Sequence, residues 1–223
     1  MTIIPIMSEP LGLFEIPEAQ HARNKVLIRE IIRKAPSDFR FEDINNPGIS
    51  HICNNRKQNI FKDFPETLDI SSIILKFSKD YINQIGYICD NFVITDAWLN
   101  IGGVNAAQGP HNHTNSFISG TYYINYSGNH SPLTFYNDRL TTSLNNSQPY
   151  LTLEVNSKIQ TNYNNNLSIK PKEGQIILWR SHLVHGFGRN NSEDRITLSF
   201  NLMPKICANG NSYSFSVSEE TRC

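Results

Sequence analysis

The chain has 223 residues, and its 20 lysine and arginine residues are balanced by 20 aspartate and glutamate residues. A net charge of zero argues against binding nucleic acid or an anionic membrane through bulk charge, which leaves only a local patch for such partners. No apolar run reaches the roughly 18 residues needed to cross a bilayer, and the N-terminus lacks the basic segment of a signal peptide. The four cysteines are scattered without metal-site spacing, so we expect reduced thiols and a cytoplasmic location.

The N-terminal part of the chain is predicted to be mainly helical. A short apolar run at residues 12–18 predicts an entry strand. Apolar residues at helical spacing predict an amphipathic helix over residues 18–35 and a second helix within residues 67–91. Asp69 or Ser71 is expected to cap the second helix. The residues between the two helices carry turn formers and weak periodicity, so no element is predicted there.

After residue 90 the chain changes to short runs of β-branched and aromatic residues separated by turn formers. Helices followed by strands predict an α+β domain whose second part is a sandwich or barrel. We expect a single domain with a helical part over residues 1–90, a β core over 91–205 and a C-terminal tail over 206–223. The runs predicted to be strands are residues 92–103, 116–126, 131–138, 150–163, 174–180, 183–188 and 195–204.

Two of the seven histidines, His111 and His113, stand one residue apart just before a predicted strand. Residues i and i+2 of an extended segment point to the same side, so the two imidazoles would share one face and could hold a metal ion. The alternative is a polar loop whose histidines are close by chance. Two further histidines, His182 and His185, precede a later strand, and we expect His182 to lie on the rim.

The strand that begins at Arg195 carries a second signal. Arg195, Thr197 and Ser199 share one face of this strand, and its apolar residues share the other. An arginine and two hydroxyls on an inner face are unusual for a core. They are typical of a pocket for a carboxylate, because the guanidinium fork matches carboxylate geometry.

These features together resemble the Fe(II)- and 2-oxoglutarate-dependent oxygenases, and within them a group found in marine bacteria and their phages. The resemblance covers about residues 95–204 and is carried by "WLNIGG", "PHNHTNSFISGTYYI", "LTFYNDR" and "PKEGQIILWRSHLVHGFGRNNSEDRITLSFN", in that order. It implies a double-stranded β-helix of the jelly-roll or cupin-like type, with N-terminal helices packed on one sheet. It also implies an enzyme that uses Fe(II), 2-oxoglutarate and O₂ to hydroxylate a C–H bond, in the cytoplasm of a bacterium or of a phage's host.

Matched residue by residue, the resemblance implies that His111 opens the HxD-like motif and that His185 is the distal histidine. Arg195 would then hold the distal carboxylate of 2-oxoglutarate, and Thr197 falls where a related pattern has its hydroxyl. Asn100 and Tyr123 are further candidates for the lining of the cosubstrate pocket.

The sequence departs from the family at His113, which stands where the family has an aspartate or glutamate. We predict that His111, His113 and His185 bind the metal together. The alternative register, with His113 and Asn115 in place of HxD, leaves one fewer strong ligand.

Two other classes remain open. Three histidines and a water also suit a zinc hydrolase. However, no carboxylate general base stands beside the ligands in the sequence, and Arg195 would have no role. In a non-catalytic cupin-like binding module, the two neighbouring histidines, the distal histidine and Arg195 would occur together only by coincidence. We expect a small-molecule or protein side-chain substrate, and neither nucleic acid nor a membrane as partner.

Four more residues receive a default interpretation. His21, His51 and His130 are expected to be ordinary surface histidines, and Trp179 is expected to be a core residue rather than a ligand contact.

Overall fold

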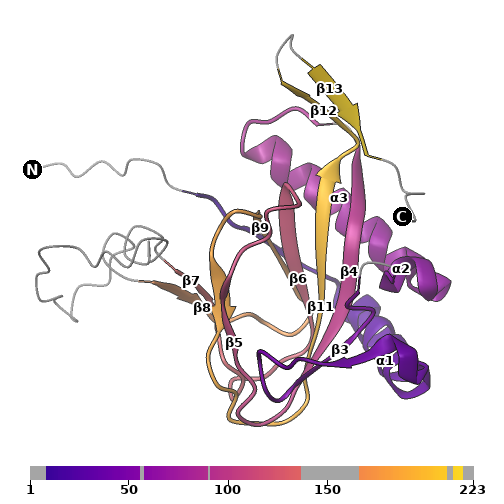
Figure 1. Cartoon of the computed structure of the whole chain (residues 1–223), viewed down its shortest axis with the longest axis vertical. Coiled ribbons are helices and arrows are strands. Elements are labelled where there is room, and N and C mark those ends of the chain that lie inside the picture. The colour runs from indigo at the N-terminus through magenta and orange to yellow at the C-terminus, as the bar shows by residue number, and fades with distance from the viewer. Residues whose placement is uncertain (1–8, 56–57, 90, 137–165, 210–212, 218–223) are drawn as a thin grey trace, which may run out of the picture.

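The computed structural model describes two antiparallel sheets that face each other, with helices against the outer face of the larger one (Figure 1). The larger sheet has the order β1 (Gly12–Glu15), β9 (Gln175–Arg180), β6 (Ile118–Asn125), β11 (Arg195–Pro204), β4 (Phe92–Gly102), β3 (Ile49–Ile52) and β2 (Arg40–Glu42). The smaller has the order β5 (Gln108–His111), β10 (His185–Phe187), β7 (Leu133–Phe135) and β8 (Leu167–Ile169). The residues described are 9–55, 58–89, 91–136, 166–209 and 213–217.

The helices are α1 (Glu18–Lys34), α2 (Ile60–Asp63) and α3 (Leu68–Gln84), with 3₁₀ turns at Ser37–Phe39 and Pro65–Thr67. A separate hairpin of β12 (Ile206–Asn209) and β13 (Tyr213–Ser216) follows β11. Both predicted long helices are confirmed, as is each predicted strand within the described residues. The run predicted at 150–163 lies outside them.

Alternation along the central strands separates a helix-covered face from an inner face. Leu198 and Phe200 of β11 are fully buried in a cluster that includes Ile28 of α1 and Ile74 of α3. Their neighbours on β11, including Thr197, line a pocket between the two sheets. The apolar set therefore anchors the helices and leaves the other face of the same strands for chemistry.

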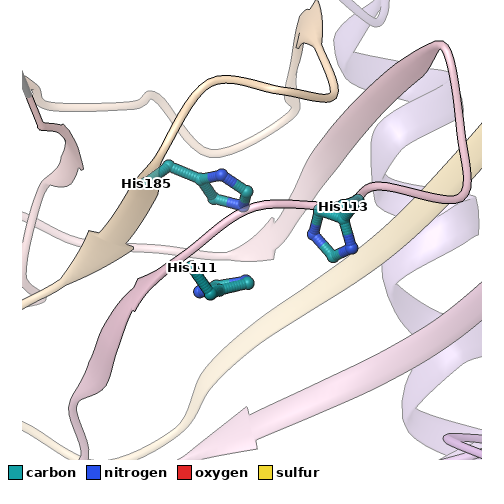
Figure 2. Close-up of side chains that lie close together, drawn as sticks. All are labelled: His111, His113 and His185. Carbon is teal, nitrogen blue, oxygen red and sulfur yellow. The ribbon is translucent and has the colours of Figure 1, made fainter. Parts of the chain in front are cut away.

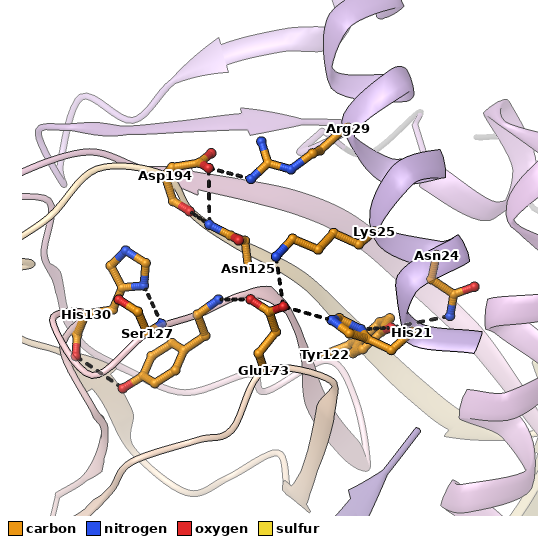
Figure 3. Close-up of polar contacts among 11 residues, drawn as sticks. His21, Asn24, Lys25, Arg29, Tyr122, Asn125, Ser127, His130, Glu173 and Asp194 are labelled. Carbon is orange, nitrogen blue, oxygen red and sulfur yellow. Dashed lines mark hydrogen bonds and ion pairs between the residues drawn. The ribbon is translucent and has the colours of Figure 1, made fainter. Parts of the chain in front are cut away.

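A polar network also connects α1 to the larger sheet (Figure 3). Glu173, just before β9, accepts from Lys25 Nζ at 2.8 Å and from the Tyr126 backbone N–H at 3.2 Å. His21 Nδ1 lies 2.7 Å from the Tyr122 hydroxyl. These contacts fix the position of the helix relative to β6 and β9.

Three sequence predictions in this region are wrong. His21, His51 and His130 are not surface residues, because each is buried and hydrogen-bonded. Neither Asp69 nor Ser71 caps α3, since a 3₁₀ turn leads directly into that helix from Thr67. The segment between α1 and α3 also contains β2 and β3, which join the larger sheet and were not predicted.

Candidate metal and cosubstrate site

The structure brings the three predicted histidines together between the sheets. β10 pairs with β5 so that His185 lies directly opposite His111, and His113 follows two residues later. One ring nitrogen from each of the three histidines lies within 4.8 Å of the other two. Figure 2 shows the three side chains converging from two segments that are far apart in the sequence. The i, i+2 spacing thus places the two imidazoles of His111 and His113 close together, and strand pairing brings His185 to them.

Backbone carbonyls set the tautomers of two of these rings. His111 Nδ1 lies 3.0 Å from the Gly109 carbonyl oxygen, and His185 Nδ1 lies 2.9 Å from that of Leu183. A carbonyl only accepts, so each Nδ1–H must donate. The Nε2 atom of each ring therefore keeps its lone pair, which is the arrangement that orients metal-binding histidines.

The surroundings also favour the neutral form of His113 and His185. Burial, reinforced by the nearby charge of His111, lowers the pKa of His185 from the ordinary 6.5 to about 3. Burial and His111 lower the pKa of His113 to about 4, and the carboxylate of Asp96 opposes the shift. Neutral imidazoles at pH 7 are ready to bind a metal without first losing a proton.

The two alternative candidates lie apart from this cluster. His182 is 53% exposed in its side chain and has its Nε2 3.3 Å from Glu9 Oε1, so it lies on the rim as predicted. Asn115 is exposed, whereas His113 is held by its backbone N–H, which donates to the Ser181 carbonyl at 2.9 Å. The geometry thus favours the register that begins at His111.

Arg195 lies in the pocket beside the histidines, which opens to solvent. Arg195 is only 3% exposed, and its guanidinium carbon is 4.0 Å from the Phe187 ring centroid and 5.6 Å from that of Tyr123. No carboxylate in the described residues forms an ion pair with it. Burial lowers the pKa of Arg195, and Tyr123 opposes this shift. A buried cation without a partner is costly, so the pocket is suited to an anion.

Two hydrogen-bond donors beside this cation are also without partners. These donors are Tyr123 Oη and Trp179 Nε1. Like the Nε of Arg195 itself, they are buried and make no hydrogen bond within the described structure. All three residues line the pocket. Trp179 packs edge-on against His185 with ring centroids 4.7 Å apart. Trp179 is thus buried, as predicted, but it also faces the ligand pocket, which its apolar strand context did not indicate.

Asn100 and Thr197 also line the pocket, but their polar groups bond to the protein. Asn100 Nδ2 donates to Thr197 Oγ1 at 3.2 Å and to Ser199 Oγ at 2.9 Å. Asn100 Oδ1 accepts from Trp98 Nε1 at 3.0 Å. The amide of Asn100 is therefore fully used in holding neighbouring side chains in place.

The residues present fit a divalent transition metal and a dicarboxylic ligand. Three imidazoles suit Fe(II) or Zn(II), and they leave coordination positions for other ligands. The partnerless cation and hydroxyl beside them suit a carboxylate.

Residues 96–201 match the model of a family described as "Putative 2OG-Fe(II) oxygenase". No curated protein matches the chain. Similar solved structures include an oxidoreductase of the 2OG-Fe(II) oxygenase family from Burkholderia pseudomallei, with 12% identity and a TM-score of 0.56 over 86% of this chain and 84% of that one. HygX from Streptomyces hygroscopicus, with nickel, 2-oxoglutarate and hygromycin B bound, has 11% identity and a TM-score of 0.55 over 86% and 83%. A Pseudomonas putida prolyl-4-hydroxylase has 10% identity and a TM-score of 0.51 over 87% and 93%.

At these identities the likeness shows a shared fold, which confirms the double-stranded β-helix of the jelly-roll type with helices packed on one sheet. The match over residues 96–201, just under half of the chain, and this shared fold make the chain similar to the Fe(II)- and 2-oxoglutarate-dependent oxygenases.

Proposed function

We propose that the chain is an Fe(II)- and 2-oxoglutarate-dependent oxygenase in which His111, His113 and His185 hold the Fe(II) ion and Arg195 binds the distal carboxylate of 2-oxoglutarate. The observation that carries the proposal is the buried guanidinium without an acidic partner, in the same pocket as three converging imidazoles. A catalytic metal site with no anion site would not require such a cation. The pairing of the two features supports a cosubstrate that has a carboxylate at the end remote from the metal.

When bound, Fe(II) would supply the centre at which O₂ is reduced while 2-oxoglutarate is converted to succinate and CO₂ and a substrate C–H bond is hydroxylated. Arg195 would fix the cosubstrate by a charge-assisted pair, with Tyr123 adding a hydroxyl donor. Phe187 and Trp179, which line the same pocket, would exclude water from it. Thr197 and Asn100 would hold the pocket wall through their mutual hydrogen bond.

The third ligand changes the charge of the site. In place of the family's carboxylate, His113 would offer a neutral nitrogen. Three imidazoles leave both charges of the metal ion uncompensated by the protein. The anionic cosubstrate would then bring the negative charge, which makes metal and cosubstrate binding mutually reinforcing in this chain.

A three-histidine zinc hydrolase is less well supported. The same donors suit zinc, but a hydrolase would leave the Arg195 guanidinium buried with no anion to pair with. A non-catalytic cupin-like module would explain neither the three converging histidines nor the buried guanidinium of Arg195.

For the substrate, we propose a small molecule or a protein side chain. The zero net charge of the chain supports neither nucleic acid nor a membrane as partner. No helix in the described residues is long and apolar enough to cross a membrane. The thiols of Cys53 and Cys207 support a reducing, cytoplasmic location, which stays a prediction.

Anaerobic titration with Fe(II) and 2-oxoglutarate, followed by optical absorption, tests the proposal without knowledge of the substrate. We expect a metal-to-ligand charge-transfer band that needs both components. It should disappear in His185→Ala and persist in His182→Ala, because His182 lies on the rim. A wild-type protein that binds zinc tightly but gives no such band with Fe(II) and 2-oxoglutarate would favour the hydrolase.

A further inference from the structure

The turn between β2 and β3 reaches both halves of the site, although it lies outside the residues that match the family model. Asp43 follows β2 directly, and the family match begins at residue 96. Gly48 packs against the loop that precedes β5, where its carbonyl accepts from the Gly103 N–H at 3.1 Å. This segment therefore lies at the edge of the larger sheet, next to the start of the strand that carries His111.

One carboxylate organises the turn. Asp43 Oδ1 accepts from the backbone N–H groups of Asn45 at 2.9 Å and Asn46 at 3.0 Å. Its other oxygen, Oδ2, accepts from Asn46 Nδ2 at 2.9 Å and is 3.1 Å from His51 Nε2. Burial raises the pKa of Asp43, but the hydrogen bonds from Asn46 and His51 outweigh it and lower the pKa overall.

The first branch runs to the cosubstrate pocket. His51 lies directly opposite Asn100 in the pairing of β3 with β4, and His51 Nδ1 is 2.8 Å from Asn100 Oδ1. The Trp98 indole N–H, which can only donate, also bonds to Asn100 Oδ1 and so identifies that atom as the oxygen. An amide oxygen only accepts, so the Nδ1–H of His51 donates to Asn100, while Nε2 lies within hydrogen-bond distance of Asp43 Oδ2. This orients the Asn100 amide nitrogen toward Thr197 and Ser199 in the pocket wall.

The second branch runs to a metal ligand. Asn46 Nδ2 is held by Asp43, and its Oδ1 accepts from the Gly109 N–H at 2.9 Å. Gly109 in turn offers the carbonyl that accepts from His111 Nδ1. Asn46 thus fixes the residue that sets the tautomer and the direction of the His111 ring.

We propose that Asp43 is a positioning residue that couples the metal ligand His111 to the cosubstrate pocket through two separate hydrogen-bond branches, one by Asn46 and one by His51. The inference rests on the proposed function of the site. It makes the β2–β3 hairpin part of the active site rather than an edge that only extends the sheet. Neither branch touches the metal or the cosubstrate, so each acts through the residue that it orients.

Single substitutions can remove the two hydrogen-bond branches separately. Asn46→Ala removes the bond to Gly109, and we expect Fe(II) affinity to fall about ten- to a hundredfold, as is typical for partners of metal ligands. The affinity for 2-oxoglutarate at saturating Fe(II) should stay within about twofold. His51→Phe keeps a ring of similar shape but no donors. It should weaken 2-oxoglutarate binding by about tenfold, which corresponds to the loss of roughly one hydrogen bond, and leave Fe(II) affinity unchanged.

Asp43→Asn should affect both constants. The substituted amide must turn its NH₂ group either toward Asn46 Nδ2 or toward the two backbone N–H groups, so at least one hydrogen bond of the turn is lost in either orientation. Asn45→Ala is the matched control, because Asn45 lies in the same turn with an exposed side chain. Fe(II) affinity is measured by anaerobic titration, and 2-oxoglutarate affinity by the charge-transfer band or by calorimetry at saturating metal.

The outcomes separate this proposal from the one on which it rests. If wild-type protein gives no Fe(II) and 2-oxoglutarate complex, the proposed function fails. If wild type binds both but Asn46→Ala and His51→Phe shift the two constants together, in proportion to a drop in Tm, the hairpin is merely structural and the coupling proposal is overturned. A split in which each variant weakens one ligand supports it, because a general loss of stability cannot produce opposite selectivities.

Discussion

Replacing Arg195 by methionine separates the requirements of ligand binding from those of folding. Methionine fills a similar volume and removes the charge. Losing one partner of a desolvated charge pair costs about 2–5 kcal/mol, and a factor of ten in affinity corresponds to about 1.4 kcal/mol. We therefore expect 2-oxoglutarate affinity to fall about 30- to 4,000-fold, while Fe(II) binding to the three histidines persists.

The free energy of unfolding of the ligand-free protein should rise or stay the same in this variant. In the wild type the guanidinium is buried without an acidic partner, and keeping an ion out of water costs several kcal/mol. Its contacts with the rings of Phe187 and Tyr123 return roughly 2 kcal/mol. Arg195→Met should consequently unfold at the same or a higher urea concentration than the wild type when no ligand is present.

The assay is urea unfolding with and without 2-oxoglutarate in the presence of Fe(II) under anaerobic conditions. A ligand at a hundred times its Kd stabilises the wild type by about 2.7 kcal/mol, and the same concentration should not stabilise Arg195→Met. Arg180→Met is the matched control, because Arg180 also lies against two aromatic rings, those of Tyr87 and Phe117, but does not line the pocket. Full ligand stabilisation of Arg195→Met would refute the assignment of Arg195 as the cosubstrate residue.

Three further predictions follow from the site and its supports. His185→Ala should abolish stoichiometric Fe(II) binding while His182→Ala leaves it unchanged, as measured by anaerobic titration; the reverse result would overturn the ligand assignment. Gly186→Ala should weaken Fe(II) binding, because its Cβ would lie 2.5 Å from the Gln108 carbonyl and force β10 away from β5, whereas Gly128→Ala meets nothing within 4 Å and should bind normally. The pKa of Glu173 is lowered because the hydrogen bonds from Lys25 and the Tyr126 N–H outweigh burial. Its contribution to stability is therefore full above the ordinary pKa of 4.5 and is lost as the pH falls below it. The deficit of Glu173→Gln in urea unfolding should shrink from pH 7 to pH 3, and a constant deficit would count against this account.

The sequence predicted the parts of the site that depend on local periodicity. The i, i+2 spacing of His111 and His113 and the alternation of the strand at Arg195 are properties of an extended chain, so they carry over directly into the fold. The meeting of His185 with His111 is a long-range pairing, and the family resemblance rather than the spacing supplied it.

Other parts could not be predicted, for physical reasons. β2 and β3 have three and four residues, which is too short for a two-residue period to stand out from a loop. His51 was interpreted as a surface residue because its partners, Asp43 and Asn100, meet it only once β3 pairs with β4. Trp179 lies in an apolar run that is typical of a core, and only the folded structure shows that its indole N–H is left without a partner beside the pocket.

The placement of polar groups in this fold has a thermodynamic reason. The pocket holds a buried cation and three histidines, and such groups destabilise a core that depends on them. Here the cost falls on one face of the central strands, while the other face packs against α1 and α3 in the largest apolar cluster of the described structure. Adjacent residues of β11 take opposite roles: Arg195 faces the pocket, and Ile196 packs in that cluster. Because these two sets of described residues share only Phe200 of β11, the pocket can keep charges that await a ligand with little effect on the packing of the helices. Changes to pocket residues should therefore alter ligand binding far more than the free energy of unfolding.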